Sequence, residues 1–188
     1  MLENYDEIML NFEDGLQSKI DWLKSEYAVI RAGRANPKML DKIYVSFYGT
    51  MTPLSQMANI SVPEARMIVI SPWDISTVKD INKAILASDL GVTPVDDGRL
   101  IRLNFPQLTE DKRKEIAKDV RKIAEESKIG IRNERKDVLE KFKSAEHDKL
   151  LSKDELEDAQ DSVQKLVDKY NGIVDDIASQ KEKEVMEI

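Results

Sequence analysis

The chain has 188 residues, 41% of them hydrophobic and 35% charged, with a formal net charge of −7. This hydrophobic fraction is enough to bury a core, so intrinsic disorder is not expected. The absence of cysteine excludes disulfides, thiol nucleophiles and thiolate metal sites, and the net charge argues against a protein that binds nucleic acid indiscriminately.

The first segment of the chain, residues 1–7, is acidic and lacks the basic-then-apolar order of a signal peptide. No apolar run is long enough to span a bilayer, so we expect a cytoplasmic protein with no membrane partner. From Leu2 to Ile30 apolar residues recur at steps of three and four. This pattern predicts a helix of about 30 residues with one buried stripe.

All six prolines lie in one central block that begins at Pro37 and ends at Pro106. Because proline interrupts a helix interior, the block predicts a small inserted domain, residues 31–105, between two helix-forming arms. The arms, residues 1–30 and 106–188, are expected to form the other domain.

Within the insert, the hydrophobic period changes from that of a helix to that of strands. Alternation in residues 43–48 and short apolar runs at 67–70 and 100–103 predict three strands. One helix is expected at 76–88, and Asp97-Gly98 predicts a tight turn. The insert is therefore predicted to be a small β/α/β domain whose strand order does not follow from these signals.

Because the insert interrupts a helical bundle, the chain must cross between the two domains twice, at residues 31–37 and 104–106. Two short connections predict a hinge that permits rotation and limits separation. The hinge candidates are Arg31, Gly33, Arg34, Asn36, Pro37, Asn104 and Pro106. An ordinary turn explains Gly33 equally well, so the hinge depends on the insertion topology.

Two further helices are predicted after the insert. Thr109 is the expected N-cap of the first, which should end near Leu151. Ser152 and Glu155 have the spacing of a capping box, in which each side chain bonds a backbone N–H of the other. Three long helices with one apolar stripe each predict an antiparallel three-helix bundle, so the fold class is α+β.

The helix after the insert is basic. Residues 112–143 carry 12 Lys or Arg and 7 Asp or Glu, whereas residues 144–188 carry 6 and 13. At 100° per residue, five cations share a narrow arc away from the apolar stripe; they are Lys114, Arg121, Lys128, Arg132 and Arg135. This basic stripe is a candidate for phosphate contact, to which arginine is suited.

A second observation favours binding by this helix. Gly130 costs about 1 kcal/mol of helix stability relative to alanine, which suggests the close approach of another group. However, exchange of ion pairs with Glu125 and Glu134 on a solvated surface explains the cations equally well on composition alone.

Other chemistry is weakly supported. His147 is expected to be a solvated surface residue, and no glycine-rich phosphate loop is present. The carboxylates of residues 154–161 formally allow a metal-dependent enzyme, but acids are favoured at a helix start. Tyr44, Tyr48 and Trp73 are capable of stacking on bases; beside short strands, we expect them to be core or half-buried residues.

A series of short motifs runs through the whole chain, and together they resemble the bacterial ribosome recycling factor family. In chain order they are residues 31–37 (RAGRANP), 48–49 (YG), 53–54 (PL), 72–74 (PWD), 88–91 (SDLG), 97–98 (DG), 101–102 (IR), 108–110 (LTE) and 131–133 (IRN) with Arg135. Each motif alone is weak, but their order and spacing make the resemblance specific.

The resemblance implies an L-shaped molecule, similar in outline to transfer RNA, with a hinge between its two domains. It implies that the factor binds the post-termination ribosome and, with elongation factor G and GTP hydrolysis by that partner, splits the subunits and releases mRNA and deacylated tRNA. Arginines matching Arg132 and Arg135 contact large-subunit rRNA in the family, and elongation factor G acts around the hinge.

The resemblance also implies a monomer that is not an enzyme, with no cofactor, metal or small-molecule substrate. We assign anchoring to Arg132 and Arg135, and steering to Lys128 and Arg121. Two alternatives are a non-enzymatic helical protein that binds RNA or acts like a chaperone, and a metal enzyme built on the carboxylates of residues 154–161.

Overall fold

The computed structural model describes residues 5–31 and 34–186. The chain divides into two compact units, Met1–Tyr27 with Ala117–Lys183 and Ala28–Ile116 with Glu184–Ile188. Three long helices and a small β-sheet domain inserted after the first of them confirm the predicted fold class.

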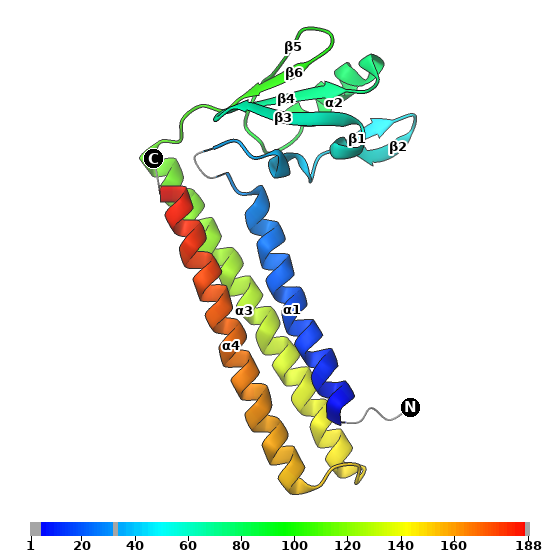
Figure 1. Ribbon diagram of the computed structural model, residues 1–188, viewed down its shortest axis with the longest axis vertical. Helices are drawn as coiled ribbons and strands as arrows, with labels where there is room; N and C mark the ends of the chain where they lie inside the picture. Colours follow the sequence, from blue (N-terminus) through cyan, green and yellow to red (C-terminus); the bar gives the residue numbers. More distant parts are fainter. Residues whose placement is uncertain (1–4, 32–33, 187–188) are drawn as a thin grey trace. The chain divides into compact units, whose positions relative to one another are not determined.

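The first unit is built from three helices that run side by side (Figure 1), namely α1 (Tyr5–Val29), α3 (Glu110–His147) and α4 (Lys153–Met186). The apolar stripe of each helix is buried in a common core, as the three-and-four spacing predicts. From α1 the core takes Ile8, Phe12, Leu16, Ile20, Leu23 and Tyr27; from α3, Val120, Ala124, Ile131, Val138 and Phe142; from α4, Ala159, Val163, Val167, Tyr170 and Val174.

Both predicted helix starts are confirmed by their cap hydrogen bonds. The Lys112 N–H donates to Thr109 Oγ1 over 3.2 Å at the start of α3. At the start of α4, the Ser152 N–H donates to Glu155 Oε2 over 2.7 Å and the Glu155 N–H donates to Ser152 Oγ over 3.2 Å. This reciprocal pair is a capping box.

Helix α3 ends at His147, four residues before the predicted end near Leu151. Lys149 has a φ of 61°, and the N–H of Leu150 donates to the carbonyl of Ala145 over 2.9 Å. This is the Schellman arrangement, which closes a helix with one left-handed residue. A lysine at that position gives no sequence signal for the helix end, because glycine is the usual choice.

The second unit contains two antiparallel sheets. Its strands are β1 (Tyr44–Phe47), β2 (Thr50–Pro53), β3 (Ala58–Glu64), β4 (Met67–Pro72), β5 (Pro94–Asp96) and β6 (Ile101–Asn104). Strands β1 and β2 form a hairpin, and the larger sheet has the order β3-β4-β6-β5. Short 3-10 turns cover Pro37–Leu40, Leu54–Gln56 and Ile75–Thr77.

Helix α2 (Val78–Leu86) lies between β4 and β5 in the chain, so the predicted β/α/β order is confirmed. Its buried residues, Val78, Ile81 and Ile85, share one hydrophobic core with the strands. The predicted turn is also present, because Gly98 has a φ of 84° and the Asp97 side chain accepts hydrogen bonds from the next residues. Strands β2, β3 and β5 have no counterpart in the prediction.

The expectation that Tyr44, Tyr48 and Trp73 are core or half-buried is wrong, since they are 51%, 84% and 72% exposed. In β1 the neighbouring Val45 is only 1% exposed. Because side chains alternate along a strand, Tyr44 must then lie on the solvent face. Tyr48 occupies a turn with a φ of 46°, and Trp73 follows the end of β4.

Candidate nucleic-acid interface

Two of the five cations of the basic stripe, Arg121 and Lys128, form ion pairs with acidic side chains of α4. Arg121 forms a bidentate ion pair with Glu182, in which Nε and Nη2 each lie 2.8 Å from a carboxylate oxygen. The hydrogen bond and the charge of Arg121 lower the pKa of Glu182, and the same contacts raise the pKa of Arg121. The guanidinium therefore already holds an anion in the geometry that a phosphate would require.

Lys128 is paired in the same way. Its Nζ lies 2.6 Å from Asp175 Oδ1 on α4 and 3.7 Å from Glu125 Oε1 on α3. The Lys128 side chain is 21% exposed, whereas that of Asp175 is 64% exposed. A phosphate must therefore compete with a close carboxylate for an ammonium group that is itself mostly covered.

Arg135 has a neutral partner. Its Nε donates to Gln164 Oε1 over 3.1 Å, and Gln164 Nε2 donates to Asp168 Oδ1 over 2.8 Å. The amide of Gln164 thus separates the guanidinium from the Asp168 carboxylate. Arg135 is exposed and keeps its positive charge available on this surface.

Arg132 is exposed on α3, and among the described residues it has no hydrogen-bond or ion-pair partner. Its position lies outside the seven-residue series that the other cations follow. Lys114, the remaining member of the predicted stripe, pairs with Glu110 within α3 at 2.7 Å. Of the five predicted cations, Arg132 and Arg135 are thus the two without a carboxylate partner in the described part of the chain.

The partners of the stripe were not predicted from the sequence, although a signal for them is present. Arg121, Lys128 and Arg135 are spaced by seven residues, and α4 carries acids at the same spacing. These acids are Asp154, Asp161, Asp168, Asp175 and Glu182. Two long antiparallel helices with seven-residue series of opposite charge are expected to pair along their seam, as in coiled coils.

Gly130 also has a structural explanation within the described chain. A Cβ added there would lie 3.1 Å from Lys19 Cδ of α1, so the group that closely approaches Gly130 is an internal side chain. The predicted external contact at this glycine is therefore not required.

The described hinge candidates lie in the second unit. Arg31 extends its guanidinium over the ring of Phe105, 5.2 Å from the centroid, and Nη2 donates to the Pro106 carbonyl. Burial and the neighbouring charge of Arg66 lower the pKa of Arg31. Arg31 therefore joins the two predicted crossing segments to each other.

The other hinge candidates have local roles. Asn36 caps a 3-10 turn that begins at Pro37, because its Oδ1 accepts from the Lys38 N–H over 3.0 Å. Asn104 ends β6, where it lies opposite Met67. Arg34 is exposed, and Gly33 lies outside the described residues.

Little among the described residues supports a metal site or another of the alternative chemistries. In residues 5–31 and 34–186 no three His, Cys, Asp or Glu side chains come together to hold a metal ion. His147 is exposed beside Asp148, with Nδ1 3.4 Å from Oδ1. A search of the same residues finds no helix with the length and apolar character to cross a membrane.

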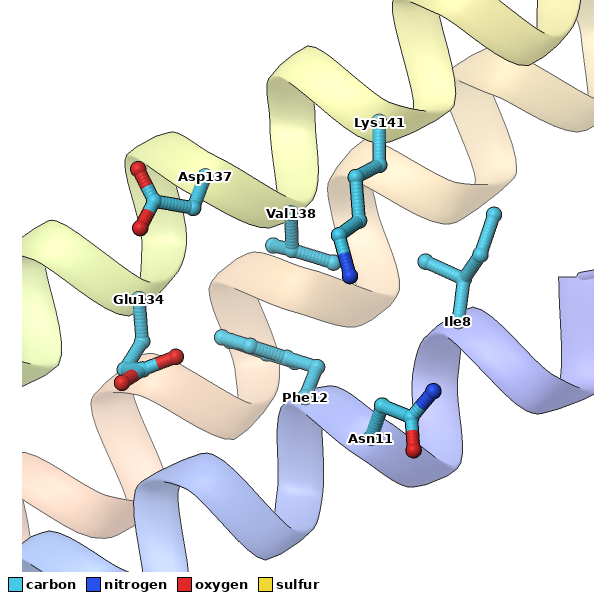
Figure 2. Close-up of a pocket in the computed structure, with 7 residues that line it drawn as sticks. All are labelled: Ile8, Asn11, Phe12, Glu134, Asp137, Val138 and Lys141. Carbon is cyan, nitrogen blue, oxygen red and sulfur yellow. The ribbon is translucent and has the colours of Figure 1, made fainter. Parts of the chain in front are cut away.

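A cavity of about 50 Å³ lies between α1 and α3, and Figure 2 shows the side chains that line it. Its lining residues are Ile8, Asn11, Phe12, Glu134, Asp137, Val138 and Lys141. Polar side chains stand around the apolar Phe12 and Val138 (Figure 2). A space of this size admits water but no metabolite.

The sequence matches the family model described as ribosome recycling factor over residues 23–186. It is similar to the ribosome-recycling factor of Clostridioides difficile, with 53% identity over 182 residues that cover 97% of this chain and 98% of that protein. It is also similar to the ribosome-recycling factor of Caldicellulosiruptor bescii, with 51% identity over 176 residues, or 94% of this chain and 96% of the relative.

Solved structures agree with these matches. A solution structure of a ribosome recycling factor superposes with a TM-score of 0.78 and 34% identity, covering all of both chains. A second structure consists of models for the T. thermophilus ribosome recycling factor and the E. coli elongation factor G bound to the E. coli post-termination complex. Its factor superposes with a TM-score of 0.65 and 36% identity, covering 98% of this chain and 100% of that one.

Proposed function

Because this chain belongs to the ribosome recycling factor family, we propose that it binds the post-termination ribosome and splits the subunits together with elongation factor G. GTP hydrolysis by that partner drives the step, and mRNA and deacylated tRNA are released. The models of such a complex for a relative that is 36% identical support these partners. The chain itself then works as a cytoplasmic monomer, without enzymatic activity or cofactor.

The anchor on large-subunit rRNA is the pair Arg132 and Arg135. The observation that carries this assignment is that both are exposed and neither has a carboxylate partner among the described residues. They lie three residues apart, so their side chains share one face of α3. Two arginines on one rigid helix suit rRNA that is recognised through the position of its phosphates.

Arg121 and Lys128 have a smaller part in this scheme than the steering role suggested by the sequence. Glu182 and Asp175 neutralise them at 2.8 Å and 2.6 Å, and an ion pair attracts distant phosphates weakly. Their contribution to binding is therefore expected to be smaller than that of Arg132 and Arg135.

The hinge transmits force from the partner to the bundle. Arg31 holds the two crossing segments together through the Pro106 carbonyl and the Phe105 ring. Two segments tied in this way move as one connection, which favours rotation over separation. The domain bounds in this scheme are residues 1–30 with 106–188 for the bundle, and 31–105 for the insert.

Light scattering of post-termination ribosomes tests the function. The protein, elongation factor G from a matched bacterium and GTP are added together, and each is omitted in turn. We expect scattering to fall only when all three are present, because separated subunits scatter less light than the intact ribosome. No fall with the complete mixture would overturn the proposed function.

A further inference from the structure

The three interhelical contacts of the basic stripe follow one register. Arg121 meets Glu182, Lys128 meets Asp175, and Arg135 reaches Asp168 through Gln164. Each step of seven residues forward on α3 matches a step of seven backward on α4. We call Asp168, Asp175 and Glu182 the acidic seam of α4.

We propose that the acidic seam of α4 sets the RNA selectivity of α3, with Asp175 and Glu182 as the residues that decide it. The inference rests on the proposed function, because it concerns the same cations and their RNA ligand. Each of the two carboxylates forms an ion pair with a cation that any RNA would otherwise contact. A phosphate of an arbitrary RNA therefore gains little binding energy at Arg121 or Lys128.

Net binding energy explains the selectivity. A phosphate that takes Arg121 from Glu182 forms one charged contact and breaks another, and it leaves a carboxylate close to the incoming RNA. A site that presents phosphates to Arg132 and Arg135 breaks no carboxylate contact. Ribosomal RNA whose shape brings phosphates to Arg132 and Arg135 therefore keeps both of these contacts. RNA of another shape loses the binding energy that contacts with Arg121 and Lys128 would otherwise give.

The positions of the carboxylates agree with this role. Asp175 and Arg121 are 64% and 69% exposed, whereas their partners Lys128 and Glu182 are 21% and 27% exposed. One member of each pair therefore lies at the surface, where RNA has access to it. Exposed ion pairs contribute little to folding. The effect of these ion pairs on RNA binding is larger than their effect on folding. Every neutralised cation removes one phosphate contact that would release counterions.

The test compares three double variants with the wild type. Asp175→Asn with Glu182→Gln removes the α4 carboxylate from both cations and leaves Lys128 only its longer contact with Glu125, at 3.7 Å. Asp161→Asn with Asp176→Asn is the control, because it changes the net charge equally at exposed carboxylates that have no partner among the described residues. Arg132→Ala with Arg135→Ala removes the anchor. Circular dichroism checks that each variant is folded.

Each protein is titrated with a fluorescent oligouridylate and with isolated large ribosomal subunits at several salt concentrations. Two freed contacts at about 0.7 each steepen the salt dependence for single-stranded RNA by about 1.4. Between about 50 and 200 mM salt, Asp175→Asn with Glu182→Gln is expected to lose roughly sevenfold more oligouridylate affinity than the control. At low salt this variant should bind oligouridylate more tightly than the control does. Its affinity for large subunits should be nearly the same as that of the control.

An oligouridylate affinity and salt slope equal to those of the control would overturn the role of the seam. If the seam variant is unstable, Glu182→Gln alone is compared with Asp161→Asn, and half the change in slope is expected. The proposed anchor is tested separately. It would be contradicted if the Arg132→Ala, Arg135→Ala variant bound large subunits with unchanged affinity. The two failures are therefore distinguishable in one set of titrations.

Discussion

Lys19 of α1 and Glu134 of α3 form an ion pair, with Nζ 3.0 Å from Oε1, and each side chain lies over a glycine of the opposite helix. A Cβ at Gly130 would lie 3.1 Å from Lys19 Cδ, and a Cβ at Gly15 would lie 2.8 Å from Glu134 Oε2. The two glycines allow the helices to approach where the long charged side chains cross. Gly130 thus belongs to the packing of the bundle.

Replacing Gly130 by alanine should stabilise the protein by about 0.5 kcal/mol. Alanine gains about 1 kcal/mol of helix propensity, and part of this gain is lost because the flexible Lys19 side chain must move. Gly172→Ala in α4 is the matched control, because a Cβ there meets nothing within 4 Å. The control should gain about 1 kcal/mol in urea denaturation. A Gly130→Ala variant less stable than the wild type would contradict this account.

The helices were predictable because each carries its own local signals. The capping residues Thr109, Ser152 and Glu155 form the expected bonds in the structure. The strand order was not predictable, since it depends on pairings such as Met67 with Asn104 that join distant segments. Strand β3 was missed where Pro63 adjoins an irregularity in the pairing with β4, because proline is normally evidence against a strand.

Tyr27 should make stability fall in the alkaline range. Its hydroxyl donates to the Val120 carbonyl over 2.7 Å, and burial together with the charge of Glu182 raises the pKa of Tyr27 to about 12. The unfolded chain loses the phenol proton near pH 10, before the folded protein does. The stabilisation is therefore complete below about pH 10 and is lost as the pH rises towards about 12.

Urea denaturation of the wild type and of Tyr27→Phe between pH 9 and about 12 measures this effect. Phenylalanine removes the hydroxyl, so the variant should be less stable at pH 9 by about 1 kcal/mol, and the difference should shrink with rising pH. Lysine titration affects both proteins and cancels in the comparison. A difference that stays constant across this range would show that Tyr27 does not titrate as described.

Arg31→Ala should impair subunit splitting more than ribosome binding. The change removes the hydrogen bond to the Pro106 carbonyl and the contact with the Phe105 ring, while Arg132 and Arg135 remain in place. We expect slower splitting in stopped-flow light scattering and unchanged affinity for large subunits. The control is Lys38→Ala, which removes an exposed cation from the same region. Equal splitting rates for the two variants would argue against a role for the Arg31 contacts that join the two connecting segments.

The five cations of the basic stripe were found from the sequence, but their availability was not. Helical geometry placed Arg121, Lys128 and Arg135 on one face correctly. Whether such a cation meets solvent or a carboxylate depends on the rotation and register of α4, which a single helix does not reveal. The acids at positions 168, 175 and 182 repeat the same spacing of seven, and reading both helices together would have identified the seam.

Equilibrium binding to large ribosomal subunits over a range of salt concentrations tests the central claim most directly. The Arg132→Ala, Arg135→Ala variant is compared with Arg121→Ala, Lys128→Ala, which removes the same charge from the same helix. We predict that the first variant reduces the salt slope by about two phosphate contacts and that the second reduces it much less. Equal losses in the two variants, or a larger loss in the second, would contradict the assignment of the anchor to Arg132 and Arg135.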